Sequence, residues 1–552
     1  MDLHAELSKI FKGDLDSSDE SREFYSHDAS LFELKPQVIG FPKSSEDVQN
    51  VVKFVASNKA AHPDLSIVPR GRGTDMSGAA IGESIVLDFS KHMNKLEELT
   101  PTSARVQPGM MFKDFDAETL KFDAFLPSYP ASRDLASVGG MASNNSGGEK
   151  SLEYGKTDNF VTELKVILAD GNEYTIRPLN REELNAKMGQ DDFEGHLYRE
   201  TFELIDKNYD EIQAAAPKVS KDSTGYHLWN VWNRDTGIFD LTKLFVGAQG
   251  TLGIITDIQY KLVPRRPHSG LLILFLKNTN ELGELIPKVL ESKPATFESF
   301  DDQTLLLCIR FMPSFLKLLG PVRFIKLLLS LVTTGVQLLR GVPKLILMVE
   351  FNGDTEEEVR QKVKNLHANL GKFRARYEIN GFEEAPTEGS SEKFWIMRRY
   401  SFQILRSKVK DKHTAPYIDD FIVAPEHLPE FLPELQKIIK KYKLFATIAG
   451  HMGDGNFHVI PLMKIEDPKE RAKLQPSQKE VNDLVLKYGG SLSGEHNDGM
   501  VRGPWLEQMY GPSVLELFKD VKRIYDPQNI FNPRKKTDAD WDFSFDHIRQ
   551  SF

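Results

Sequence analysis

The sequence predicts a mixed fold, either α/β or α+β, that is divided into at least two domains. A chain of 552 residues is long enough for two large domains or three smaller ones. From Pro36 onward, short β-rich runs alternate with segments of helical periodicity, which is typical of mixed folds. After the Pro-Arg-Arg-Pro run at 264–267 the segments become longer and more amphipathic, so we expect a domain boundary there.

The expected elements follow from the spacing of apolar residues. The first 30 residues are polar and acidic and should form a surface lead-in. Valines recur at helical spacing after Ser45, which we expect to cap that helix. In chain order we expect a strand at 37–41, the helix after Ser45, strands at 65–69 and 84–88, a strand at 345–351 and a helix over 355–370.

Composition narrows the function classes. The net charge of −10 and the pI near 5.9 argue against nucleic acid as the main partner. The single cysteine, Cys308, excludes an intramolecular disulfide and a cysteine-ligated iron–sulfur cluster. No basic and then apolar leader is visible at the N-terminus, so we expect a reducing, cytoplasmic setting.

Two histidine-bearing segments near the C-terminal end carry the clearest chemical signal. His451 and His458 flank a Gly-Asp-Gly turn, so a strand–turn–strand path can bring both rings to one point. Glu495 can complete a divalent-metal site, and His496 beside it can act as a base, pointing to the opposite face if the segment is extended. The alternative is that all four are ordinary loop residues.

Three segments of small residues lie in the first half, at 70–78, 127–148 and 246–256. Glycines allow positive φ angles and let backbone N–H groups converge on an anion. The spacing around Gly71 and Gly73 does not fit a Rossmann fingerprint, because the third glycine comes too late. Together the three segments favour one long, phosphate-bearing ligand, although three independent turns remain an alternative.

These motifs resemble known flavoenzymes. The small-residue segments are similar to the flavin-binding half of the vanillyl-alcohol-oxidase (PCMH) type FAD enzymes. The two histidine segments, together with the Asn-Pro motif at 525–533, resemble the FAD-linked D-2-hydroxyacid dehydrogenases, a group that includes D-lactate, glycolate and D-2-hydroxyglutarate dehydrogenases. The resemblance runs from about Tyr25 to Lys536, with the motifs in the same order.

The resemblance implies an α+β fold of two domains, in which an antiparallel sheet covered by helices caps the flavin. The implied ranges are a lead-in at 1–30, an FAD-binding domain at 31–266, a C-terminal substrate or cap domain at 267–536, and a tail at 537–552.

The resemblance also implies the cofactor. FAD should be bound non-covalently, because residues 70–78 contain no histidine or cysteine that could attach it. The implied FAD-binding residues are Arg70, Gly71, Arg72, Gly73, Thr74, Ser77, Pro127, Ser137, Gly139, Gly140, Ser143, Asn144, Gly147, Gly250, Ile254, Ile255 and Asn532.

The implied chemistry is oxidation of a D-2-hydroxy acid, D-lactate or a close relative, to the 2-oxo acid. His451, His458 and Glu495 would hold a divalent metal (zinc, manganese or iron), His496 would be the base, and a hydride would pass to flavin N5. Arg398 matches an arginine that grips the substrate carboxylate, with a solvent-facing helical arginine as the alternative.

The chain departs from its relatives at two places. Asn497 stands where many have glycine after the Glu-His pair, which would alter the turn that aims His496. Asp419 and Asp420 stand where some D-2-hydroxyglutarate enzymes have a lysine, and we expect this acidic pair to repel a dicarboxylate.

Several functional alternatives stay open. The flavoenzyme could instead be a D-2-hydroxyglutarate or glycolate dehydrogenase with a soluble acceptor, or an oxidase that passes electrons to O₂. Without flavin, the chain could be a metal-dependent hydrolase or a non-catalytic, membrane-attached binding protein.

Residues 312–343 form an apolar segment with no acidic residue and four cations, Lys317, Arg323, Lys326 and Arg340. Its uncharged stretch, 327–339, is shorter than the ~20 residues needed to cross a bilayer. We therefore expect peripheral contact with the cytoplasmic face of an anionic membrane, where a quinone could reoxidise the flavin. The alternative is a buried helical hairpin on the cap.

Overall fold

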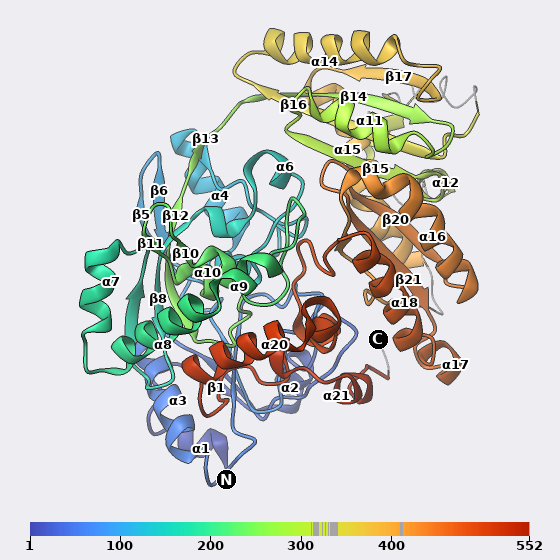
Figure 1. Cartoon of the computed structure of the whole chain (residues 1–552). Helices are drawn as coiled ribbons and strands as arrows, with labels where there is room; N and C mark the ends of the chain where they lie inside the picture. The colour runs from blue at the N-terminus through green and yellow to red at the C-terminus, as the bar shows by residue number, and fades with distance from the viewer. Residues whose placement is uncertain are drawn as a thin grey trace.

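The computed structural model describes residues 1–310, 341–408 and 412–550, together with positions 312, 320–322, 324, 325, 327, 328, 330 and 331 between them. It shows a first domain and a cap, joined where the chain passes from β13 (Val263–Pro264) to β14 (His268–Leu276) (Figure 1).

The first domain begins with a four-stranded sheet of order β1-β2-β4-β3. Its strands are β1 (Asp14–Asp16), β2 (Val38–Phe41), β3 (Ile67–Arg70) and β4 (Ile85–Asp88), with β4 parallel to both β2 and β3. Helix α3 (Ser45–Asn58) buries its four valines in the core beneath this sheet. The N-cap is Ser44 rather than Ser45, because the Ser44 side chain accepts the N–H of Asp47.

A second, antiparallel sheet of order β5-β6-β12-β8-β9 completes the first domain. Its strands are β5 (Leu96–Leu99), β6 (Ser103–Val106), β8 (Val161–Ile167), β9 (Glu173–Ile176) and β12 (Ile254–Lys261). Two short pairs join β7 (Ala124–Phe125) to β13 and β10 (Trp232–Asn233) to β11 (Ile238–Phe239). The other helices here are α1 (Leu3–Leu7), α2 (Asp19–Phe24), α4 (Phe112–Thr119), α5 (Val138–Asn144), α6 (Ser151–Tyr154), α7 (Arg181–Met188), α8 (Phe193–Lys207), α9 (Tyr209–Ala215) and α10 (Thr242–Phe245).

The cap is built on an eight-stranded antiparallel sheet of order β17-β14-β16-β15-β20-β21-β18, with β19 also paired to β21. Its strands after β14 are β15 (Thr296–Asp301), β16 (Leu345–Gly353), β17 (Ile379–Ala385), β18 (His413–Thr414), β19 (Phe421–Ile422), β20 (Ala446–His451) and β21 (Asn456–Met463). Successive residues of β14 enter two different cores, so both faces of the sheet are covered. An antiparallel cap beside a largely separate first domain confirms α+β rather than α/β.

Helices pack on both sides of the cap sheet (Figure 1). The helices that follow β14 in the chain are α11 (Leu282–Leu290), α12 (Asp302–Arg310), α14 (Glu356–Gly371), α15 (Glu388–Lys408), α16 (Leu428–Lys441), α17 (Pro468–Arg471), α18 (Leu474–Lys487), α19 (Gly499–Arg502) and, near the C-terminus, α20 (Leu506–Tyr525) and α21 (Trp541–Asp546).

Helix α20 lies in the range predicted for the cap, yet it packs into the first domain. Phe518 and Tyr525 belong to the same core as the strands of the five-stranded sheet. Farther along, Ile530 and Phe531 enter the core beneath β2, β3 and β4. The chain therefore returns to its first domain after building the cap, and Figure 1 shows α20 beside α8.

Most of the predicted membrane segment, 312–343, lies outside the described residues, so its predicted conformation is untested. Among its described positions, Leu327 is buried, whereas Val322, Ile325 and Leu328 are exposed. Within the described parts of the chain, none of the helices combines the length and the hydropathy needed to cross a membrane.

Candidate active site

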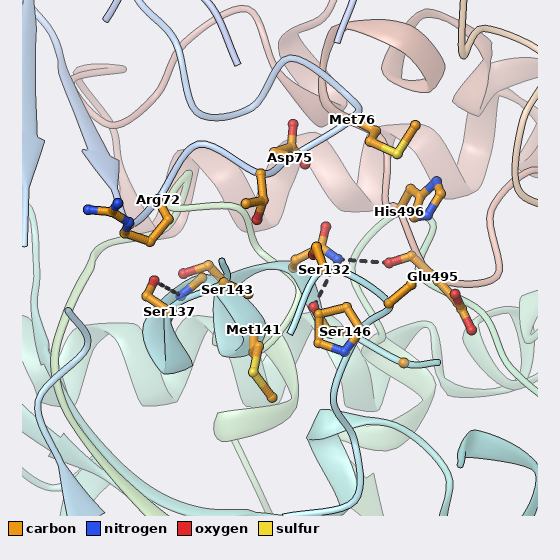
Figure 2. A pocket seen from close by; sticks show the side chains of 18 of the residues that line it. Arg72, Asp75, Met76, Ser132, Ser137, Met141, Ser143, Ser146, Glu495 and His496 are labelled. Atoms are coloured by element: carbon orange, nitrogen blue, oxygen red, sulfur yellow. Dashed lines mark hydrogen bonds between the residues drawn. The ribbon is translucent and has the colours of Figure 1, made fainter. Parts of the chain in front are cut away.

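A cavity of about 380 Å³ lies where the small-residue loops of the first domain meet the sheet of the cap. Figure 2 shows Arg72 and Ser137 at one end of this cavity and Glu495 and His496 at the other. The two sets of motifs that the sequence keeps far apart therefore line one continuous space.

The loop after β3 is shaped for close approach of the backbone. A side chain at Gly71 would meet the Oγ atom of Ser137 at 2.1 Å, and Gly73 adopts a φ of +64°. Ser137 caps α5, since its hydroxyl accepts the N–H of Gly140. The loop and the first turn of α5 thus form a cradle whose walls are backbone rather than side chain.

The cradle fits a flavin dinucleotide. Among described residues, the Oδ1 atom of Asn144 is buried without a hydrogen-bond partner, although its Nδ2 atom donates to the carbonyl of Glu495 over 2.8 Å. A buried acceptor of this kind calls for a donor from a bound group. Asn144 lines the cavity, so its free acceptor is available to a ligand bound there.

Twelve of the seventeen predicted FAD-binding residues line the cavity: Arg70, Gly71, Arg72, Gly73, Thr74, Ser137, Gly139, Gly140, Ser143, Asn144, Gly147 and Ile255. The other five, Ser77, Pro127, Gly250, Ile254 and Asn532, are not part of its wall. Asn532 has a structural role outside the wall. Its amide donates to the carbonyls of Ala79 and Gln249 and so stabilises the loops that form the wall.

The two arginines of the first loop differ in what they contact. Arg70 is 5% exposed, and its guanidinium donates to the carbonyls of His27 and Ala80. Among the residues that the structure describes, Arg72 makes one long hydrogen bond, 3.3 Å, to the Oγ atom of Ser90. Arg72 is therefore the better placed of the two to pair with a phosphate.

The hairpin of β20 and β21 brings the first two histidines together as predicted. Ala449 pairs with His458, and His451 pairs with Asn456, so both rings reach the same end of the hairpin. The centroids of the His451 and His458 rings are 5.4 Å apart. The Nε2 atoms of His451 and His458 lie 3.2 and 3.9 Å from the carboxylate oxygens of Glu495.

His496 does not point to the opposite face from Glu495. The carboxylate of Asp420 accepts the backbone N–H groups of both Glu495 and His496, at 3.0 and 2.7 Å, which bends the segment into a turn. Asn497 completes the turn with a φ of +67°. The His496 ring consequently stacks on His458, with 5.1 Å between centroids. The prediction that Glu495 and His496 point to opposite faces of an extended segment is therefore wrong.

Buried carboxylates orient all three imidazoles through their Nδ1 atoms. The Nδ1 atom of His451 contacts Glu298 at 2.5 Å. Asp419 reaches two rings, with Oδ1 at 3.1 Å from His458 Nδ1 and Oδ2 at 2.8 Å from His496 Nδ1. The Nε2 atoms of His451 and His458 are thereby directed at Glu495, which is how proteins commonly prepare histidine ligands for a metal.

Charge shifts the pKa values of these groups strongly. Burial lowers the pKa of His496, but Asp420 and Asp419 outweigh it and raise that pKa to about 9. Burial also lowers the pKa of His451, but the negative charges of Glu298 and Glu495 outweigh this effect and raise that pKa to about 9. Burial raises the pKa of Glu495, yet His451 and Lys221 hold it well below its usual range.

The donor set at this end of the cavity fits a divalent metal. Among described residues, the ligand atoms of Asp420, His458, Glu495 and His496 all lie within 4.8 Å of one another. Asp420 is engaged by backbone N–H groups, and Asp419 orients the His496 ring. Two of the three predicted ligands, His458 and Glu495, belong to this group. The third, His451, does not belong to it, although its Nε2 atom lies 3.2 Å from Glu495.

Arg398 reaches the cavity from α15, with its guanidinium 3.1 Å from Glu298. Trp395, one turn earlier, and Ile460 of β21 line the same region of the cavity with apolar surface. The guanidinium and the histidine cluster therefore share a partner in Glu298, which joins the arginine to the predicted metal site.

Glu298, Lys221 and Asp419 contribute to the site but were not predicted for it. The interpretation of Asp419 and Asp420 as a charge that repels substrate is wrong, since both side chains are buried behind the cavity wall. An acidic pair next to a strand was a usable signal, because buried carboxylates require partners. Glu298 and Lys221 stand in segments with no such signal.

Two protein-family models of FAD-linked enzymes match this chain. A protein-family model described as "FAD binding domain" matches residues 36–177, and one described as "FAD linked oxidases, C-terminal domain" matches residues 266–536. The two matched ranges contain the cradle and the histidine cluster, respectively.

Relatives are similar over most of the chain at modest identity. D-2-hydroxyglutarate dehydrogenase of Escherichia coli (strain K12) is 27% identical over 95% of this chain, which spans only 50% of that relative. Glycolate oxidase subunit GlcD of Bacillus subtilis (strain 168) is 25% identical, and the match covers 94% of this chain and 93% of the relative.

Solved structures confirm the predicted PCMH-type fold. Alkyldihydroxyacetonephosphate synthase superposes with a TM-score of 0.64 at 18% identity, over 96% of this chain and 85% of that one. p-Cresol methylhydroxylase superposes with a TM-score of 0.59 at 16% identity, over 96% and 94% of the two chains.

Proposed function

Since the chain belongs to the FAD-linked oxidases, we propose that it oxidises a D-2-hydroxy acid, D-lactate or a close relative, to the corresponding 2-oxo acid. The observation that carries this proposal is the convergence of Arg398, His496 and Glu495 at the end of the cavity that lies away from the cradle. These groups supply a cation for a carboxylate and a base for a neighbouring hydroxyl.

Each residue has a stated task in this reaction. Arg398 pairs with the substrate carboxylate, for which its planar guanidinium is suited. His496 takes the hydroxyl proton at Nε2, while Asp419 holds its Nδ1 atom. Bound FAD supplies the acceptor for the hydride that leaves the substrate carbon.

We place a divalent metal (zinc, manganese or iron) among His451, His458 and Glu495. Such a cation lowers the pKa of a coordinated hydroxyl, which favours its deprotonation. The protein contributes the orientation, because Glu298 and Asp419 fix the two metal-facing imidazoles before any cation arrives.

A monocarboxylate suits the cap end of the cavity better than a dicarboxylate. Trp395, Ala449 and Ile460 line this end with apolar surface. Among the described residues of the cavity wall, Arg398 is the one lysine or arginine that the cap contributes. The relatives named for 2-hydroxyglutarate and glycolate make those acids the competing substrates.

We infer that the electron acceptor is a quinone in the cytoplasmic membrane, reached through peripheral contact by the apolar segment 312–343. Between Asp302 and Glu350 the sequence contains six lysines and arginines and no acid. Exposed apolar side chains concentrate in the same region, at Leu306, Ile309, Val322, Ile325, Leu328 and Val342. Apolar surface flanked only by cations suits an anionic lipid interface.

The absorption spectrum and a substrate panel test the proposal. The purified protein should be yellow and lose its flavin absorbance on anaerobic mixing with D-lactate, and more slowly with L-lactate, glycolate or D-2-hydroxyglutarate. Fastest bleaching by D-2-hydroxyglutarate would assign the dicarboxylate instead. A colourless protein that hydrolyses esters in the presence of metal would replace the flavoenzyme with a hydrolase.

A further inference from the structure

Residues 220–225 form a coil that crosses from the first domain to both histidine-bearing segments of the cap. The Ser220 hydroxyl donates to the Oδ1 atom of Asp454, in the turn between β20 and β21, over 2.7 Å. Three residues on, the Ser223 N–H donates to the carbonyl of Ser493 over 3.0 Å. This one coil therefore contacts the hairpin of His451 and the loop that precedes Glu495.

Lys221 occupies the centre of this coil and is buried against two cap carboxylates. Its Nζ atom lies 2.5 Å from Oε1 of Glu495 and 3.3 Å from Oδ2 of Asp454. The side chains of Lys221, Glu495 and Asp454 are 2%, 7% and 4% exposed. A buried ion pair that loses one partner leaves an uncompensated charge, which is strongly unfavourable.

The contact fixes how Glu495 presents its two oxygens. Oε1 is engaged by Lys221 and lies 3.2 Å from His451 Nε2. Oε2 is turned toward His458, whose Nε2 atom is 3.9 Å away. A rotation of the carboxylate out of its present plane would lengthen the contact with Lys221, so the lysine favours this orientation.

We propose that Lys221 is a positioning residue that aims Glu495 at the two histidines and ties the hairpin turn to the Glu-His loop across the domain boundary. Lys221 is absent from the cavity wall and acts through Glu495. The part of this inference that concerns catalysis through Glu495 rests on the proposed function. The part that concerns the contact between the two domains does not.

The test compares Lys221→Met with Lys150→Met. Lys150 is also a first-domain lysine paired with a buried cap carboxylate, Glu350, at 2.6 Å, but it does not contact Glu495. Lys221→Met should retain FAD and lose about 10²-fold in kcat, the usual cost of a misplaced group. KM should change far less, because Arg398 is untouched. The Zn²⁺ concentration for half-maximal binding should rise.

Lys221→Arg, which keeps the cation, should recover most of kcat, and Lys150→Met should keep wild-type kcat and Zn²⁺ binding. Lys221→Gln serves if the methionine variant does not fold, with the same expected loss. Wild-type kcat in Lys221→Met or Lys221→Gln would overturn the inference. A loss of kcat in Lys150→Met equal to that in Lys221→Met would overturn it as well.

A double-mutant cycle separates this inference from the proposed function. Lys221→Met and Glu495→Gln should shift the urea unfolding midpoint non-additively, because the two groups are in contact. If no 2-hydroxy acid reduces the wild-type flavin, the proposed function fails and the cycle alone decides. Additive shifts then overturn the tie, and non-additive shifts support it.

Discussion

The Nδ1 atom of His496 lies 2.8 Å from Oδ2 of Asp419, and the other oxygen of the same carboxylate reaches His458. One buried acid thus orients the proposed base and a proposed metal ligand together. Because Asp419 is absent from the cavity wall, its charge acts on the imidazoles rather than directly on a ligand.

Replacing His496 by glutamine should slow flavin reduction by roughly 10²–10⁴-fold, the usual contribution of a general base. FAD should remain bound, because the cradle is built by other segments. Stopped-flow absorbance under anaerobic conditions measures the rate. His413→Gln, outside the cavity wall, is the control, and reduction of His496→Gln at the wild-type rate would remove His496 from the mechanism.

The rate of flavin reduction should rise with pH up to about 9. Only the neutral imidazole can take a proton, and Asp420 and Asp419 raise the pKa of His496 to about 9 against the opposing effect of burial. Below that value the rate should increase about tenfold per pH unit. Asp419→Asn removes one anion, lowers the pKa and shifts the profile to lower pH. A rate that is constant from pH 6 to 9 would contradict this assignment.

The double variant His451→Ala/His458→Ala should lose the bound metal and most of the affinity for substrate. Elemental analysis of protein dialysed against metal-free buffer gives the stoichiometry. His496→Gln should keep its metal, since His496 is assigned as the base. A full equivalent of metal in the double variant would eliminate the site.

Acid precipitation should release the flavin into the supernatant. Residues 70–78 offer no histidine or cysteine for attachment. Among described residues, the nucleophilic rings in the cavity wall are His451, His458 and His496, all engaged by carboxylates. Yellow colour that stays with the pellet would show a covalent bond.

Ile325→Ser/Leu328→Ser should reduce co-sedimentation with anionic vesicles. These side chains are 56% and 43% exposed, whereas Leu327 between them is buried and is left unchanged. Phe445→Ser, at an equally exposed apolar residue elsewhere on the cap, is the control. Wild-type protein that stays in the supernatant at low salt would indicate a soluble acceptor.

Local patterns were sufficient to predict the parts of the site that are built within one segment. The Gly-Asp-Gly turn predicted the hairpin that brings His451 and His458 together, and the glycine loops predicted the cradle. Strand limits were right to within two residues at β2, β3 and β4, because polar residues or proline interrupt their apolar runs.

Contacts between distant segments could not be predicted in this way. Glu298 precedes its partner His451 by 153 residues, and Lys221 precedes Glu495 by 274. The residue spacing in these segments does not predict either contact. The sequence interpretation of Asp419 considered only its charge. Its role depends instead on its burial and on its contacts with His458 and His496.

The return of α20 to the first domain has a consequence for synthesis of the chain. Phe518 and Tyr525 complete a core whose buried members outside α20 end at Leu262, so the ribosome must add the whole cap before that core can close. At about 5–20 residues per second the delay is on the order of tens of seconds. During that interval the first domain exposes the apolar surface that α20 later covers, and we therefore expect the nascent first domain to bind chaperones.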